Sequence, residues 1–220
     1  MMSHWQNRPE PNWGKFKFNQ PYSKGLKKLR EVLKTTDFDP ATLWQWGTMQ
    51  AMALIEVLKA TEAQFGQEGQ KLVYDALRRV GFDVGSQILK GVEIPEDLSL
   101  AEFASFYATV INRIVYASLE SPTIDNEEQV SFDILWCPHQ DHYSAFDCRV
   151  QRYFVQGILD AAAEHVQQLG FQVRFESTMP AGAETCHFVL WKADPDETAR
   201  WEAYTAKLEK KALELAKRKG

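Results

Sequence analysis

The stretch VSFDILWCPHQDHYSAFDC, from Val130 to Cys148, holds the clearest strand signal of the chain and its densest group of reactive side chains. Its first residues alternate between apolar and more polar types, which is the two-residue period of a strand buried on one face. The apolar members of this alternation are Val130, Phe132, Ile134 and Trp136. If the alternation continues, Cys137 points away from the face that carries Val130. The thiols and imidazoles that follow make this the place to look for chemistry.

The segments before this strand predict helices. Asp39 and Pro40 are typical of a helix cap and first turn, and we expect this helix to end near Gly66. A second apolar stripe over 69–80 predicts an amphipathic helix that stops at Gly81. A shorter helix is expected around 84–89, and the capping box at 99–102 predicts another that runs toward Val110.

The second half of the chain predicts two pairs of strands with a helix between them. The expected strands are 112–120, 130–136, 171–176 and 186–191, and the long helix between the pairs begins near Arg149. A last helix follows Asp194. This order predicts an α+β fold, with an antiparallel sheet of about four strands packed against a mostly helical N-terminal half and the long helix.

Composition limits the classes of function. We expect a single domain over 39–220, preceded by an arm over 1–38 with a short basic helix around 23–33. A net charge of −5 without a basic cluster argues against nucleic acid, and no apolar run approaches the roughly 20 residues of a membrane span. The first residues lack the features of a signal peptide, so we expect a cytoplasmic protein with three free thiols.

Four segments of the chain, taken together, resemble the L-2-amino-thiazoline-4-carboxylic acid hydrolase-like family. They are EAQFGQEGQKLVYDALRRVGFDVG (62–85), FDILWCP (132–138), FDCRVQRYFVQGILD (146–160) and AGAETCHFVL (181–190). The resemblance implies a cysteine-lined site that opens the ring of a cyclic amidine-thioether to give N-carbamoyl-L-cysteine. The last segment also resembles the closing strand of vinyl-reductase-type ligand-binding domains, which implies a pocket between sheet and helices. The cysteines of the resemblance fall on Cys137, Cys148 and Cys186, although Gly-Ala-Glu stands before Cys186 where a Gly-Asp pair is expected.

As a hydrolase, the chain would act on a C–N or C–S bond of a small carboxylated heterocycle. A thiolate attacks an amidine carbon when a neighbouring imidazole lowers its pKa, so Cys137 is the candidate nucleophile and His139 or His142 the proton acceptor. Cys148 is a rival nucleophile because it precedes a helix. The candidates for substrate binding are two arginines for the carboxylate and residues that could line a pocket: Arg149, Arg174, Cys186, Trp136 and Tyr143.

Other interpretations of the same residues stay open. Zinc or another transition metal would find soft ligands of the right types in Cys137, His139, His142 and Cys148, although their spacing is irregular. Each thiol is equally explained as a small apolar residue of a core. The main alternative to an enzyme is therefore a small-molecule- or metal-binding or sensing domain with the same pocket. A third interpretation is an assembly protein, a homo-oligomer whose N-terminal arm buries against a second subunit.

Overall fold

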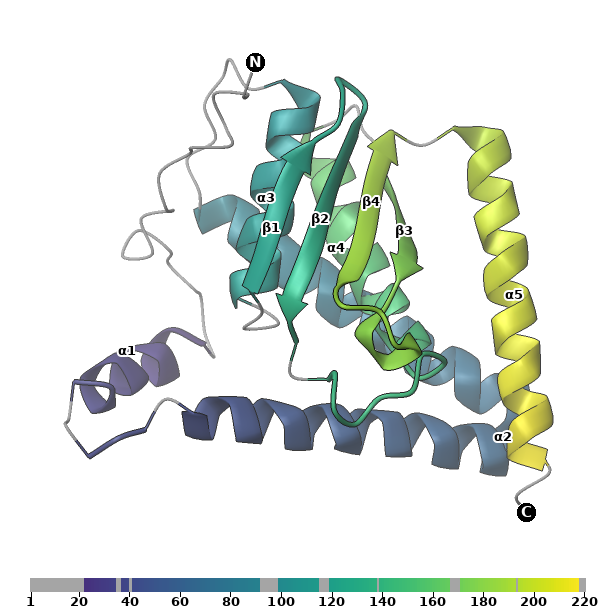
Figure 1. The fold of residues 1–220 in the computed structure, drawn as a ribbon. Helices are drawn as coiled ribbons and strands as arrows, with labels where there is room; N and C mark the ends of the chain where they lie inside the picture. The colour runs from purple at the N-terminus through teal and green to yellow at the C-terminus, as the bar shows by residue number, and fades with distance from the viewer. Residues whose placement is uncertain are drawn as a thin grey trace.

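The computed structural model describes residues 22–34, 37–39, 41–91, 99–114, 119–137, 139–166, 171–192 and 194–217 of the 220-residue chain. Figure 1 shows an α+β architecture, as the sequence predicts. In chain order the elements are α1 (Tyr22–Val32), α2 (Ala41–Gly91), α3 (Leu100–Ile114), β1 (Leu119–Ile124), β2 (Gln129–Trp136), α4 (Arg149–Val166), β3 (Phe171–Ser177), the 3-10 turn η2 (Met179–Ala181), β4 (Cys186–Lys192) and α5 (Pro195–Lys217).

Helix α2 covers the range of three predicted helices, and a kink at Gly66 divides it where the first of them is expected to end. Its backbone bends at Gly66, where φ is 59° and ψ is −134°, a conformation that only glycine adopts readily. The predicted stop at Gly81 is wrong, because the helix continues to Gly91. Gly81 instead allows close packing of α2 on α4, since a side chain there would collide with the carbonyl oxygen of Phe154.

The four strands form one antiparallel sheet in the order β1-β2-β4-β3. Val130, Phe132 and Ile134 of β2 are buried, which confirms the predicted inner face. The first strand lies later than predicted. Helix α3 extends to Ile114, because its buried residues keep the helical period as far as Ile111. Strand β1 therefore begins later and includes residues that were expected to form the turn.

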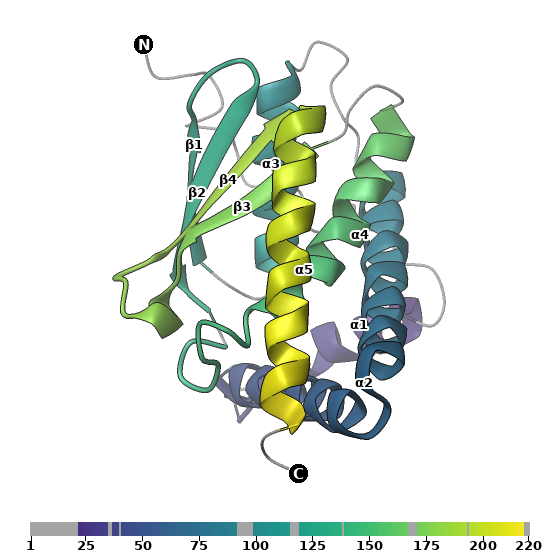
Figure 2. The ribbon, with the colours of Figure 1, turned by 90° about the vertical axis from the view of Figure 1, so that its right-hand side faces the viewer.

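Helices cover one face of the sheet. Figure 2 shows α3 and α4 on the same side of the sheet, with α2 packed against α4 on the side away from the strands. The main core lies between the sheet and α3 and α4, and a smaller cluster joins α2 to the start of α4. Helix α5 runs beside the edge strand β3, across the open side between the sheet and the helices, and reaches α2 at its C-terminal end.

Three of the predicted helix starts carry the expected caps, and at the first of them the Ala41 amide donates to Asp39 Oδ1 at 2.9 Å at the start of α2. The amide of Glu102 donates to Ser99 Oγ while Ser99 N–H donates to the Glu102 carboxylate, so the capping box of α3 is confirmed. The amides of Asp196 and Glu197 both donate to Asp194 Oδ1 at the start of α5. The short helix expected within the arm corresponds to α1, and residues 1–21 lie outside the described part of the chain.

Candidate functional site

An apolar cavity lies between the inner face of the sheet and α3 and α4. We call it the apolar cavity, and its volume is about 100 Å³. Its walls come from β2, β3, β4, both helices and the loop over 137–148. The lining is mostly aliphatic and aromatic, with side chains such as Ile111, Phe132, Ile134, Val155, Ile158, Phe175 and Leu190.

All three cysteines line the apolar cavity, so the fold brings together the thiols that the sequence singles out. The predicted orientation of Cys137 is wrong. The chain leaves β2 at Trp136, and Cys137 lines the same cavity as Phe132 and Ile134 rather than the opposite face. Cys186 is buried and accepts a hydrogen bond from the Met179 amide at 3.2 Å.

The thiols are protonated at neutral pH. Burial raises the pKa of Cys137 to about 11 and that of Cys148 to about 12, and it also raises the pKa of Cys186. The three groups affect one another, because a charge on Cys186 would disfavour a second charge on Cys137 or Cys148. The position of Cys148 just before α4 therefore does not give it a stabilised thiolate, since desolvation raises its pKa.

Cys137 and His139 form the closest approach of a thiol to an imidazole in the cavity. Cys137 Sγ lies 3.1 Å from His139 Nδ1, and His139 Nε2 lies 3.4 Å from Gln151 Nε2. Burial lowers the pKa of His139 to about 4, so the imidazole is neutral at neutral pH. The pair is thus a neutral thiol beside a neutral imidazole, and it supplies hydrogen-bonding groups at one end of an apolar space.

The two predicted carboxylate clamps lie elsewhere. Arg149, the first residue of α4, donates through Nη2 to both oxygens of Glu62 on α2 at 2.8 and 2.7 Å, and both side chains are buried. Arg174 of β3 forms ion pairs with Glu176 and Glu197. Neither arginine is among the residues that line the apolar cavity.

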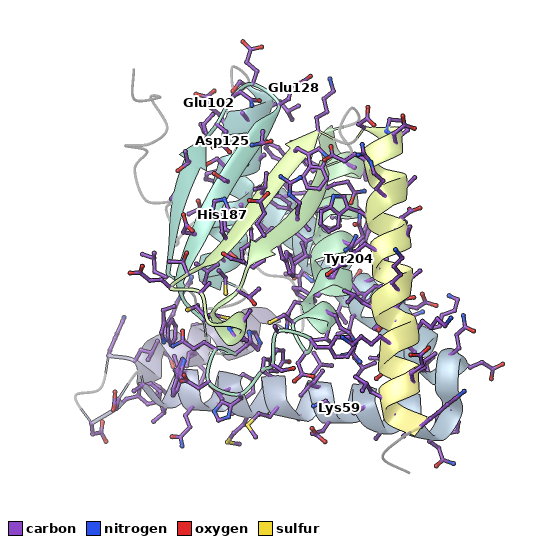
Figure 3. All side chains as sticks on the ribbon, turned by 45° about the vertical axis from the view of Figure 1, so that its right-hand side comes forward. Lys59, Glu102, Asp125, Glu128, His187 and Tyr204 are labelled. Carbon is purple, nitrogen blue, oxygen red and sulfur yellow. The ribbon has the colours of Figure 1, made fainter. Side chains whose placement is uncertain are left out.

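The remaining predicted site residues divide between the cavity and its surroundings. Tyr143 lines the cavity and donates its hydroxyl to the Ala51 carbonyl at 2.8 Å, which ties the loop to α2. Figure 3 labels Lys59 of α2, which forms a second tie at 3.4 Å to Asp147. Trp136 packs near Trp44 with ring centroids 5.9 Å apart, and His142 is exposed.

The predicted metal site gains no support from the geometry. Within the described ranges, no three side chains of His, Cys, Asp or Glu lie close enough to hold a metal ion. Of the four predicted ligands, Cys137 and His139 approach one another, whereas the exposed His142 lies outside the residues that line the cavity.

A second hollow lies on the other side of the cavity wall, between α5, β3 and the start of α4. We call it the basic cavity; its volume is about 380 Å³, and it shares Cys148, Val173, Phe175 and Thr178 with the apolar cavity. Its charged lining residues are Arg149, Arg152, Glu176 and Lys211, and its aromatic lining residues include Phe146, Trp201 and Tyr204. No expectation drawn from the sequence pointed to this site. The signal that was available is the three-four spacing of Trp201, Tyr204, Leu208 and Lys211 along one face of α5.

Comparison with known proteins shows the family but no activity. No family model matches the chain. A protein of Archaeoglobus fulgidus described as uncharacterized is 53% identical over 216 residues, which are 96% of each chain. The chain therefore belongs to the same family as this archaeal protein. The resemblance to the thiazoline hydrolase-like family stays a prediction.

Solved structures share parts of the fold at low similarity. A trafficking protein particle complex subunit 3 from Naegleria fowleri, covalently bound to palmitic acid, matches 67% of this chain and 95% of its own with 12% identity and a TM-score of 0.48. The H-NOX domain of Shewanella oneidensis in the Fe(II)CO ligation state matches 80% and 91% with 14% identity and a TM-score of 0.31. These values carry no inference about a ligand here. None of the helices in the described residues combines the length and apolar character that a membrane crossing requires.

Proposed function

We propose that this protein binds a small, mostly uncharged apolar molecule in the apolar cavity. The observation that carries the proposal is the composition of the lining, in which three protonated thiols and a neutral imidazole stand among aliphatic and aromatic side chains. Ligand sites of this kind combine apolar walls with a few polar groups that orient the ligand. Here His139, Gln140 and Gln151 supply the polar groups.

The size of the cavity limits the ligand. A volume of about 100 Å³ is below the ~150 Å³ of an apolar cavity that holds benzene. A one-ring ligand such as toluene therefore already requires the loop over 137–148 to move outward, whereas a single xenon atom does not. The loop is held to α2 by the Tyr143 hydroxyl and by Lys59, so these ties set the resistance to such opening.

The experiment compares two leucine substitutions in α3. Ala108 lines the cavity, whereas Ala104 is buried in the same helix outside the lining, so Ala108→Leu and Ala104→Leu form a matched pair. Toluene should raise the thermal unfolding temperature of the wild type and of Ala104→Leu but not that of Ala108→Leu, since only the last fills the cavity. Xenon under pressure should shift NMR signals of the lining residues. Toluene stabilising Ala108→Leu as much as the wild type would refute the proposal, and so would a wild type that responds to neither probe.

The hydrolase remains a second candidate, because Cys137 Sγ and His139 Nδ1 lie 3.1 Å apart inside a cavity. Two features favour binding over catalysis. A nucleophilic pair needs a thiolate, yet the pKa of Cys137 is raised to about 11. A carboxylated substrate needs a cation, and Arg149 and Arg174 are paired with glutamates outside the cavity.

Thiol reactivity separates the two candidates. With a pKa of about 11, Cys137 should react with iodoacetamide at neutral pH roughly a hundredfold more slowly than a thiol of pKa 9. A Cys137→Ser variant should keep the toluene response. Turnover of 2-aminothiazoline-4-carboxylate that disappears in Cys137→Ser, together with fast alkylation of the wild type, would establish the hydrolase and reject the binding domain.

A further inference from the structure

The lining of the basic cavity holds more positive than negative side chains. Its lining includes three cations, Arg149, Arg152 and Lys211, and a single carboxylate, Glu176. Glu176 is already paired with Arg174. Within the described part of the chain, Arg152 and Lys211 form no ion pair within 4 Å, although Glu209 and Glu202 lie close enough to Arg152 to oppose the lowering of its pKa by burial. The lining itself therefore carries two more cations than carboxylates.

Arg149 adds a buried charge behind Arg152 and Lys211. Its side chain is 5% exposed, and its Nη2 contacts Glu62, while Nε and Nη1 make no hydrogen bond within the described residues. Buried polar groups of this kind normally have partners, so Glu62 leaves part of the guanidinium's hydrogen-bonding capacity unused next to the basic cavity. The Phe146 ring lies 4.5 Å from the guanidinium carbon and covers it.

Aromatic rings hold the cations in place. Arg152 lies 5.6 Å from the Trp201 ring centroid and donates to the Trp201 carbonyl at 3.3 Å, and Lys211 Nζ lies 5.8 Å from the Phe146 ring. Trp201 and Tyr204 meet edge to face with centroids 5.6 Å apart. Figure 3 shows Tyr204 on the side of α5 turned toward the sheet. The cavity therefore presents flat apolar surfaces next to fixed positive charges.

We propose that the basic cavity is a second binding site, and that it takes a small aromatic carboxylate. The carboxylate lies between Arg152 and Lys211, where it accepts charge-assisted hydrogen bonds. Its negative charge offsets the excess positive charge of the cavity lining. The ring lies against Val173, Phe175 and the aromatic residues of α5. A volume of about 380 Å³ holds a ligand of this size without moving the backbone. This site does not depend on a ligand in the apolar cavity.

The test uses benzoate as the probe and benzamide as its uncharged analogue, on the full chain. An NMR titration should give saturable shifts in the amides of α5 near Trp201, and benzamide should bind at least tenfold more weakly. Lys211→Gln and Arg152→Met should each weaken benzoate binding about tenfold or more. Lys210→Gln is the matched control, because Lys210 is exposed on the same helix and does not line the cavity.

The outcomes separate this site from the apolar cavity. Ala108→Leu should bind benzoate like the wild type, since the substitution fills only the other cavity. Equal binding of benzoate and benzamide, equal losses in Lys210→Gln and Lys211→Gln, or the absence of saturation would each overturn the proposal. Loss of benzoate binding in Ala108→Leu, with Lys211→Gln unchanged, would move the carboxylate to the apolar cavity and overturn it as well.

Discussion

The two cavities share four wall residues but differ in what surrounds them. The apolar cavity lies inside the main core, among buried and partly buried side chains of the sheet, α3 and α4. The basic cavity is closed by α5, a 23-residue helix in which Ala212 alone among its described residues is buried. The two cavities are separated by a wall made of Cys148, Val173, Phe175 and Thr178. On one side this wall faces the main core, and on the other it faces the edge of the molecule under α5.

The charge of the ionisable groups at neutral pH differs between the two cavities. Inside, desolvation keeps Cys137 and His139 neutral, and no cation lies among the lining residues. At the edge, Arg152 keeps its charge although burial lowers its pKa, because its ordinary pKa is far above neutrality. A ligand without charge suits the first cavity, and an anion suits the second.

The largest expected effect concerns the ion pair that anchors the start of α4 beneath both cavities. Arg149→Leu should destabilise the protein by about 3–5 kcal/mol, because it leaves the Glu62 carboxylate buried with only the Gln70 amide as a donor. The measurement is urea-induced unfolding followed by circular dichroism. The partly exposed pair of Arg78 with Asp160 joins the same two helices, and Arg78→Leu should cost no more than about 1 kcal/mol. Similar losses in both variants would contradict the assigned burial of the Glu62–Arg149 pair.

The next largest effect is the loss of stability when a large side chain that lines each cavity is shortened to alanine. Ile134 is buried in β2 and lines the apolar cavity, so Ile134→Ala should cost about 2–4 kcal/mol and enlarge that cavity. Leu208 lines the basic cavity from the half-buried face of α5, and Leu208→Ala should cost about 1 kcal/mol or less. The same unfolding measurement compares them. A costlier Leu208→Ala would show that α5 is part of the main core.

His139 makes the free energy of unfolding of the protein depend on pH. Its folded pKa of about 4 lies below the value of 6.5 expected in the unfolded chain, so its contribution is complete above pH 6.5 and is lost as the pH falls toward 4. The loss should be on the order of 2 kcal/mol. His139→Gln should flatten the difference in unfolding free energy between pH 7 and pH 4.5, whereas the exposed His142→Gln should not. Parallel pH profiles for the wild type and His139→Gln would show that His139 titrates like an exposed histidine.

Local signals in the sequence predicted the parts of the fold that depend on neighbouring residues. The alternation in β2 predicted its buried face, and the caps at Ser99 and Asp194 predicted where α3 and α5 begin. The misses depend on distant contacts. Gly81 continues its helix because α4 crosses there, and Arg149 pairs with Glu62, 87 residues away. No pattern near either residue records these partners.

The features of the two cavities also differ in whether local sequence or distant contacts determine them. The family resemblance implied a cysteine-lined site at Cys137, Cys148 and Cys186, and all three thiols line the apolar cavity. It did not predict their raised pKa values, which depend on desolvation by side chains from α3, α4 and the sheet together. The basic cavity was missed because α5 contributes only half of it, and the sequence of one helix does not show what lies opposite.

The smallest expected effect tests whether α5 unfolds separately from the main core. Asp194→Ala removes the side chain that accepts from the Asp196 and Glu197 amides, and Ser99→Ala removes the matching acceptor of α3, so each loses about 1 kcal/mol of local helix stability. Because α3 is buried in the core, Ser99→Ala should lower the global free energy of unfolding by that amount. Because α5 packs on few buried residues, Asp194→Ala should instead speed amide hydrogen exchange along the first turns of α5 while the exchange of β2 and β4 stays unchanged. Hydrogen exchange read by mass spectrometry distinguishes these outcomes. Faster exchange throughout the sheet in Asp194→Ala would mean that α5 unfolds together with the core, and the basic cavity would then be as permanent as the apolar one.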